Sequence, residues 1–333
     1  MKKFIVSLLV LVLAAALLAG ILGWRQYQQF LSTPLAVSED GQIFELPSGT
    51  SYIGMVRRLQ QMGLTADAWP WRLLQRLEPR RIKAGEYRLE QGLTPGQWLD
   101  ILTRGDVIRY RFTIVEGWTF KQLRAALAAD PVLEQTLAEA DNPDIMALLD
   151  RPDQHPEGWF LPETYLYNRG DSDLAILDQA LAAMEAALAE SWAGREPELP
   201  LDEPYELLIL ASIIEKETGL PEERDEIAGV FIRRLNKGMR LQTDPTVIYG
   251  LGDSFDGDIR YRDLSKDTPY NTYTRDGLPP TPIAMPGRAA LDAAANPLSG
   301  SSLYFVATGD GGHYFSDSLR EHNAAVDRYQ RNP

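Results

Sequence analysis

The chain has 333 residues, 44% of them hydrophobic and 24% charged, a composition typical of a packed protein with one large or two modest domains. Its formal net charge of -14 argues against a nucleic-acid binder, which usually carries a basic face. The sequence contains no cysteine, so disulfides, thiolate metal sites and cysteine nucleophiles are excluded.

The first thirty residues predict a membrane anchor. Residues 1–3 include two lysines, and the stretch from Phe4 to Trp24 carries no charge and is dominated by Leu, Val, Ala and Ile. As a helix this stretch would span roughly 30 Å, about the hydrocarbon thickness of a bilayer. A cleaved signal peptide is the alternative, but its apolar region normally has only ~7–15 residues. The two lysines before the span, against Arg25 after it, favour residues 1–3 as a cytoplasmic stub, with the remainder outside.

Residues 25–41 are expected to form a linker, and residues 42–107 a small unit. Its expected elements are a strand over 43–46, helices over 53–62 and 69–77, a strand over 85–89, and a helix that begins at Pro95 with Thr94 as N-cap. This pattern resembles the glycan-binding LysM module. A structural spacer near the membrane would explain the same elements equally well.

Residues 108–333 are expected to form the larger domain. The predicted elements are a strand over 108–115, a helix through Leu123 and Leu127, a helix over 174–192, a mostly apolar helix that begins near 207, and a buried strand over 303–307. The proline-rich stretch 277–287 can form neither a helix nor a central strand, so it predicts a rigid loop suited to lining a cleft.

The apolar helix that begins near Leu207 leads to a pair of glutamates. Gly219 is a good end for this helix, with Pro221 behind it. At about 100° per residue, one face would hold Leu207, Leu210, Ala211 and Ile214. Glu217 lies one turn beyond Ile214, on the margin of that face, whereas Lys216 should point to solvent.

The position of Glu217 suits a general acid. Partial burial disfavours the charged carboxylate, and the negative end of the helix dipole acts in the same direction, so both raise its pKa. A carboxyl that stays protonated near neutral pH can donate a proton in catalysis. The alternative is that Glu215 and Glu217 are ordinary surface charges paired with Lys216 or Arg224.

Five motifs then occur in a distinctive order. They are ASIIEKET at 211–218, LQTDPTVIYG at 241–250, YNTY at 270–273, GLPP at 277–280 and YFVA at 304–307. In this order they closely resemble the endolytic murein transglycosylases, also called the YceG-like family. The anchor and the LysM-like unit match that layout too, so the resemblance covers nearly the whole chain. It implies that Glu217, directly before Thr218, is the catalytic residue, with Glu215 as the second choice.

The resemblance also implies the reaction and its setting. The expected enzyme is a peptidoglycan lytic transglycosylase that cleaves bonds between N-acetylmuramic acid and N-acetylglucosamine within glycan strands, leaves 1,6-anhydro ends and so terminates or trims nascent strands. It needs no metal or organic cofactor. It would cross the cell inner membrane once, with the catalytic domain, residues 108–333, in the periplasm. The expected partners are peptidoglycan strands, the membrane and peptidoglycan synthases, but no nucleic acid.

Six further residues are candidates for binding sugar hydroxyls, acetamides or ring faces: Gln242, Thr243, Asp244, Tyr249, Asn271 and Tyr273. For each of them, turn capping or core packing explains the residue about as well. Asp244-Pro245-Thr246 in particular is typical of a helix N-cap. His313 could line the cleft, although a structural role is favoured, and three histidines make a metal site remote.

Two other classes of function compete with this interpretation. A membrane-tethered glycan binder that positions other enzymes would need the anchor and the LysM-like unit but not Glu217. A pyridoxal-phosphate lyase would need a Schiff-base lysine and a phosphate-binding loop, and the sequence has no Gly-rich phosphate loop. The expected fold is α+β: a transmembrane helix, the LysM-like unit, and a larger mixed domain with a short antiparallel sheet and a lysozyme-like core around Glu217.

Overall fold

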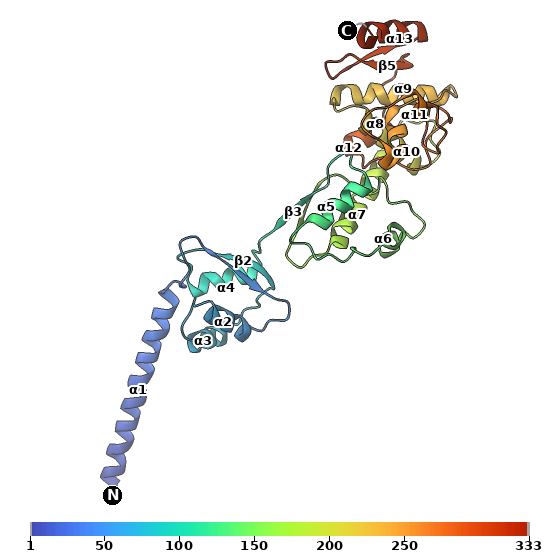
Figure 1. Cartoon of the computed structure of the whole chain (residues 1–333). Helices are drawn as coiled ribbons and strands as arrows, with labels where there is room; N and C mark the ends of the chain where they lie inside the picture. The colour runs from blue at the N-terminus through green and yellow to red at the C-terminus, as the bar shows by residue number, and fades with distance from the viewer. Residues whose placement is uncertain (1, 332–333) are drawn as a thin grey trace. The chain divides into compact units, whose positions relative to one another are not determined.

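The computed structural model describes residues 2–331, which fold as a mixture of helices and short strands in the predicted α+β class (Figure 1). The chain divides into two compact units, Met1–Tyr110 and Arg111–Pro333. That division falls three residues beyond the expected boundary at 107. Met1 of the expected stub and residues 332–333 of the expected catalytic domain lie outside the described residues. The LysM-like unit and the lysozyme-like core stay predictions.

The N-terminal helix α1 (Lys2–Ser32) is longer than the apolar stretch that predicts it. Its segment Lys3–Ser32 is long and apolar enough to cross a membrane, a test that a signal sequence also passes. The helix continues beyond Trp24 because its last turns pack onto the first unit: Tyr27 is buried, and the Phe30 ring meets the edge of Trp71 at 5.2 Å. The first part of the expected linker is therefore helical.

The first unit contains the five elements that the sequence predicts. They are β1 (Gln42–Leu46), α2 (Tyr52–Gln61), α3 (Trp69–Leu77), β2 (Gly85–Leu89) and α4 (Pro95–Arg104). The two strands pair antiparallel, with Gln42 opposite Leu89 and Leu46 opposite Gly85. Alternate residues of β1 and β2 face the helices, so Phe44 and Tyr87 contact the edge of Trp98 at 5.2 and 5.5 Å. These aromatic rings form the centre of the unit's core.

A capping box starts helix α4, as the sequence predicts for Thr94. The Thr94 hydroxyl accepts a hydrogen bond from the Gln97 backbone N–H at 3.4 Å, and the Gln97 side chain accepts from the Thr94 N–H at 2.9 Å. Thr94→Ala should therefore destabilise the first unit by about 1 kcal/mol. Native-state hydrogen exchange of the α4 amides would measure this loss. Thr103→Ala makes the same chemical change inside α4, away from its N-terminus, and should leave exchange nearly unchanged; equal effects of the two variants would contradict a capping role.

The second unit is mainly helical, with two pairs of short strands. In chain order it contains β3 (Tyr110–Thr113), α5 (Phe120–Ala129), α6 (Asn142–Leu148), β4 (Thr164–Tyr167), α7 (Asp173–Ala193), α8 (Pro204–Glu217), α9 (Arg224–Asn236), α10 (Asp244–Leu251), α11 (Tyr261–Ser265), α12 (Arg288–Ala295), β5 (Tyr304–Ala307), β6 (His313–Ser316) and α13 (Leu319–Val326). Single turns of 3-10 helix cover Pro221–Glu223 and Gly252–Ser254, and a turn of π-helix covers Asp327–Arg331. Strand β3 pairs with β4, and β5 with β6.

Helix α8 is the central helix of the second unit. Helices α7, α9, α10 and α12 all contact it, and every residue from Leu207 to Ile214 is buried. The expectation of a single apolar face was therefore wrong, because a helix enclosed on all sides is hydrophobic all round. The helix ends at Glu217 with Thr218 as its C-cap, one residue before the predicted Gly219, and Lys216 is exposed as predicted.

A C-terminal hairpin follows α12. Strand β5, which the sequence predicts, pairs antiparallel with β6, which it does not, and Tyr304 lies opposite Ser316. Only Val306 of β5 is fully buried, so the expectation of a wholly buried strand was wrong. A two-stranded hairpin covers one face at most, which leaves alternate residues partly open to solvent.

Candidate active site

Glu217 is the last residue of α8 and is half-buried. The Thr243 hydroxyl donates a short hydrogen bond to Glu217 Oε1. Burial raises the pKa of Glu217 to about 7; the Thr243 hydrogen bond and nearby His313 lower it, whereas the negative charge of Asp244 raises it. The carboxyl can therefore hold a proton near neutral pH and exchange it readily.

A cluster of buried threonines positions Thr243. The Thr243 N–H donates to the Thr272 hydroxyl at 3.1 Å, the Thr246 hydroxyl donates to the Thr243 carbonyl at 2.8 Å, and the hydroxyls of Thr246 and Thr272 lie 2.9 Å apart. Thr243 is the N-cap of α10, yet its hydroxyl is turned to Glu217 and makes no cap hydrogen bond. The prediction of Asp244 as N-cap was wrong, because Asp244 is already the first residue of the helix. Thr272 was not among the residues predicted for the site.

The buried guanidinium of Arg234 holds the backbone that leads into Thr243. Its Nη1 donates to the carbonyls of Leu241 at 2.9 Å and Arg240 at 3.1 Å, and its Nε donates to the Leu303 carbonyl at 2.6 Å. Gln242 follows these two carbonyls, and its φ of 50° is in the left-handed region. Its side-chain oxygen accepts a long hydrogen bond of 3.5 Å from Arg234 Nη1. Arg234 was not predicted as a site residue, because nothing local in the sequence marks an arginine of α9 as buried.

Asp244 and Tyr273 form a pair beside the catalytic candidate. The Tyr273 hydroxyl donates to Asp244 Oδ1 at 2.6 Å. Burial, the hydrogen bond to Asp244 and the charge of Glu217 all raise the pKa of Tyr273, so it stays a neutral donor. Thr243, Asp244 and Tyr273, three of the six candidate binding residues, thus gather at Glu217.

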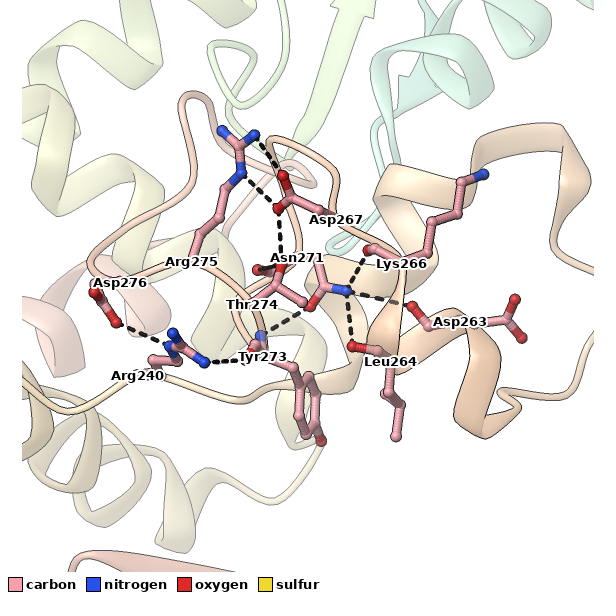
Figure 2. Close-up of polar contacts among 10 residues, drawn as sticks. All are labelled: Arg240, Asp263, Leu264, Lys266, Asp267, Asn271, Tyr273, Thr274, Arg275 and Asp276. Atoms are coloured by element: carbon pink, nitrogen blue, oxygen red, sulfur yellow. Dashed lines mark hydrogen bonds and ion pairs between the residues drawn. The ribbon is translucent and has the colours of Figure 1, made fainter.

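Asn271 is built into the loop that presents Tyr273 (Figure 2). Its amide nitrogen donates to the carbonyls of Lys266 at 2.7 Å and Leu264 at 3.0 Å, and its oxygen accepts from the Tyr273 N–H at 2.8 Å. Ion pairs of Arg275 with Asp267 at 2.9 Å and of Arg240 with Asp276 at 3.0 Å hold the rim of the same loop. The side chain of Asn271 is buried with both ends bonded, which supports a structural role; its contact with substrate stays a prediction.

Tyr249 binds a second buried carboxyl that the sequence analysis passed over. Its hydroxyl donates to Glu157 Oε2 at 2.9 Å, while the N–H of Phe120 at the start of α5 donates to Oε1 at 2.8 Å. Burial raises the pKa of Glu157 to about 7, although both hydrogen bonds lower it. The Tyr249 ring also packs against Tyr270 at 4.8 Å. These contacts tie α10 to α5, and sugar contact by Tyr249 stays a prediction.

Glu215, the second choice for catalysis, is hydrogen-bonded to the end of the proline-rich loop. Its Oε2 accepts a hydrogen bond from the Gly287 N–H at 3.0 Å, at the start of α12. One turn earlier, Ser212 Oγ accepts from the Ile283 N–H at 3.0 Å. Burial raises the pKa of Glu215 as well. A carboxylate at a helix N-terminus is stabilising, so the contacts of Glu215 explain it structurally and leave Glu217 as the better acid.

His313 pairs with Glu223 close to the end of α8. Its Nδ1 lies 2.7 Å from Glu223 Oε2, and its backbone N–H donates to Oε1 at 2.7 Å. The Thr218 hydroxyl reaches the same carboxylate at 3.4 Å. This arrangement joins β6 to the residue after Glu217, in line with the structural role favoured for His313. Within residues 2–331 no three carboxylate or histidine groups are placed to hold a metal ion.

Comparison with known proteins places this arrangement in a family. Residues 44–328 match the YceG-like family. The chain belongs to that family. It is 34% identical over 265 residues to an endolytic murein transglycosylase of Bacillus subtilis, covering 74% of this chain and 73% of the relative.

Two further relatives extend the comparison. An endolytic murein transglycosylase of Streptococcus pneumoniae is 28% identical over 98% of this chain, which spans 65% of that relative's length. A crystal structure of a YceG-like protein from Listeria monocytogenes is 30% identical and has a TM-score of 0.56, covering 86% of this chain and 99% of the other. The family that the motifs predict is thereby confirmed.

Proposed function

We propose that this chain is a membrane-anchored lytic transglycosylase that cleaves peptidoglycan strands internally and leaves 1,6-anhydromuramic ends. The observation that carries the proposal is the half-buried carboxyl of Glu217 at the end of α8, which is bonded to Thr243 and has a pKa raised to about 7 by burial. The names of the relatives from Bacillus and Streptococcus support the same reaction. Helix α1 would hold the enzyme in the cell inner membrane with residues 111–333 in the periplasm, where it would terminate or trim nascent strands beside their synthases.

One carboxyl serves both proton transfers in this reaction. Protonated Glu217 donates its proton to the glycosidic oxygen as the bond to C1 of the muramic residue breaks, and the N-acetylglucosamine chain leaves as an alcohol. The N-acetyl group of the muramic residue stabilises C1. Ionised Glu217 then takes the proton of the C6 hydroxyl while O6 bonds to C1, which closes the anhydro ring and regenerates protonated Glu217. No water is consumed, and a pKa near 7 suits both steps.

The first test is the chemistry of the product. The full-length chain in detergent should release, from purified peptidoglycan, internal fragments that mass spectrometry finds lighter by one water than hydrolytic fragments. Fragments with reducing ends would make the protein a hydrolase. Binding to peptidoglycan without any fragments would support the tethered glycan binder instead.

Two neighbouring substitutions should move the pH dependence of this activity in opposite directions. The first step needs protonated Glu217, so activity should fall as the pH rises through its pKa. Thr243→Val removes a hydrogen bond that lowers this pKa, so the alkaline limb should move to higher pH. Asp244→Asn removes a negative charge that raises it, so the limb should move to lower pH. Rates measured from pH 5 to 9 would check both, and shifts in one common direction would contradict the assignment of the titrating group.

A further inference from the structure

The first unit begins within one helical turn of the predicted membrane span. Trp24, the last residue of the apolar stretch, is 54% exposed, whereas Tyr27 is buried in the core of the unit. Three residues of helix advance only ~4.5 Å. The surface of the unit that adjoins α1 therefore has to lie close to the bilayer surface whenever α1 is in a membrane.

Helix α4 contacts the end of α1, and α2 and α3 contribute aromatic side chains beside it. Phe30 of α1 meets Trp71 of α3 edge-on at 5.2 Å. Tyr52, at the start of α2, is close enough to Tyr27 of α1 and to Arg80 for both to influence its pKa, which burial raises most. The residues that contact the end of α1 thus include members of the segment 52–83, beside those of α4.

This segment has the opposite charge to the rest of the chain. It contains seven basic residues (Arg57, Arg58, Arg72, Arg76, Arg80, Arg81 and Lys83) and two acidic ones (Asp67 and Glu78), a net charge of +5 in a chain of -14. Arg80 pairs with Glu78 and Asp100. Within residues 2–331 no ion pair engages Arg57, Arg58, Arg72, Arg76 or Arg81. Five guanidinium groups of this segment are therefore not neutralised by an ion pair.

The outer face of α3 also exposes apolar side chains among these arginines. Trp69 is 37% exposed and Leu77 is 53% exposed. At 100° per residue, Trp69 and Arg76 lie on one face of the helix, opposite the buried Trp71, and Leu77 lies at the edge of that face, 60° from the buried Leu74. An amphipathic helix that carries Trp, Leu and Arg outward is typical of segments that lie in the plane of a membrane interface.

We propose that α3 and the adjoining arginines of residues 52–83 dock on the anionic phospholipid surface of the membrane that α1 crosses. Trp69 and Leu77 enter the interface, and the arginines pair with lipid phosphates. The docking holds the first unit flat against the bilayer. It rests on α1 as a membrane anchor, which is part of the proposed function, but it does not depend on catalysis by Glu217.

Because the chain has no cysteine, a single introduced cysteine can report on this surface. Full-length Leu77→Cys, carrying a nitroxide label, is reconstituted into vesicles of phosphatidylcholine with or without phosphatidylglycerol. Ile43→Cys, on β1 and equally exposed at 53%, is the matched control, and Leu11→Cys reports insertion of α1. Accessibility of each label to lipid-soluble oxygen and to a water-soluble nickel chelate is measured by electron paramagnetic resonance.

The Leu77 label should favour oxygen over nickel several-fold more than the Ile43 label, and only with phosphatidylglycerol present. Adding Arg72→Glu and Arg76→Glu should abolish the difference, whereas Arg88→Glu and Arg109→Glu, on exposed arginines of the same unit outside the segment, should preserve it. A Leu77 label that faces water while the Leu11 label is in lipid would overturn docking alone. A Leu11 label in water would overturn the anchor and docking together, and immobilisation of the Leu77 label only by added peptidoglycan would assign the face to glycan instead.

Discussion

Glu217→Gln should lower the rate of strand cleavage by about 10²–10⁴-fold and leave the fold intact. Gln has nearly the shape of Glu, and its side-chain oxygen can still accept the hydrogen bond from Thr243. It can neither give a proton to the glycosidic oxygen nor take one from the C6 hydroxyl. Release of anhydro fragments from peptidoglycan, compared at equal enzyme concentration, would measure the loss.

The same substitution should make the protein more stable at alkaline pH. The pKa of Glu217 is raised from 4.5 to about 7, so between these values the folded state holds more protons than the unfolded state. Stability therefore falls as the pH rises through this window and stays lower above it. Removing the charge should recover up to about 3 kcal/mol at pH 8 and little at pH 4. Denaturant unfolding of both proteins at the two pH values would test this.

Glu215→Gln is the matched control for Glu217→Gln. It changes the same chemical group half a turn away, and Gln can still accept the hydrogen bond from the Gly287 N–H. Most of the activity should remain. An inactive Glu215→Gln beside an active Glu217→Gln would transfer the catalytic role to Glu215, and full activity of both would remove it from this helix end.

The sequence predicts most helices and strands here because their signals are local. Thr94 and Pro95 mark the start of α4, and the apolar run from Leu207 to Ile214 marks α8. Strand β6 was missed because it has only four residues, His313–Ser316, and pairs only through the hairpin with β5. The last turns of α1 were missed because helix there depends on packing of Tyr27 and Phe30 against the first unit.

The candidate site also combines residues that local motifs predict with residues that only the fold brings together. Glu217, Thr243, Asp244 and Tyr273 belong to recognisable motifs, and the structure brings them together. Their supports come from far along the chain: Glu157 is 92 residues from its partner Tyr249. A glutamate in a loop sequence gives no sign that it is buried, since burial depends on elements that pack over it. Long-range supports of this kind need the fold before they can be identified.

Arg234→Met should lower the free energy of unfolding by roughly 3 kcal/mol and also disturb catalysis. Methionine fills much of the same space but donates no hydrogen bonds. The carbonyls of buried Leu241 and half-buried Leu303 would then be left without their guanidinium donor. The backbone before Thr243 would lose the hydrogen bonds that Arg234 donates to it, so the Thr243 hydroxyl would bond to Glu217 less often. Denaturant unfolding and the pH profile of activity would measure the two effects.

The pH profile separates a positioning role from simple destabilisation. A weaker Thr243 hydrogen bond leaves the pKa of Glu217 higher, so Arg234→Met should move the alkaline limb of activity upward, as Thr243→Val does. Arg233→Met is the control: Arg233 donates to the carbonyls of Ser302 at 2.7 Å and Leu298 at 2.8 Å, but makes no contact with residues 240–242. Arg233→Met should be less stable than the wild type, and the alkaline limb of its activity should stay at the same pH. If the alkaline limb of activity were at the wild-type pH in both variants, the hydrogen bonds of Arg234 would stabilise the fold alone. The pKa of Glu217 would then not depend on Arg234.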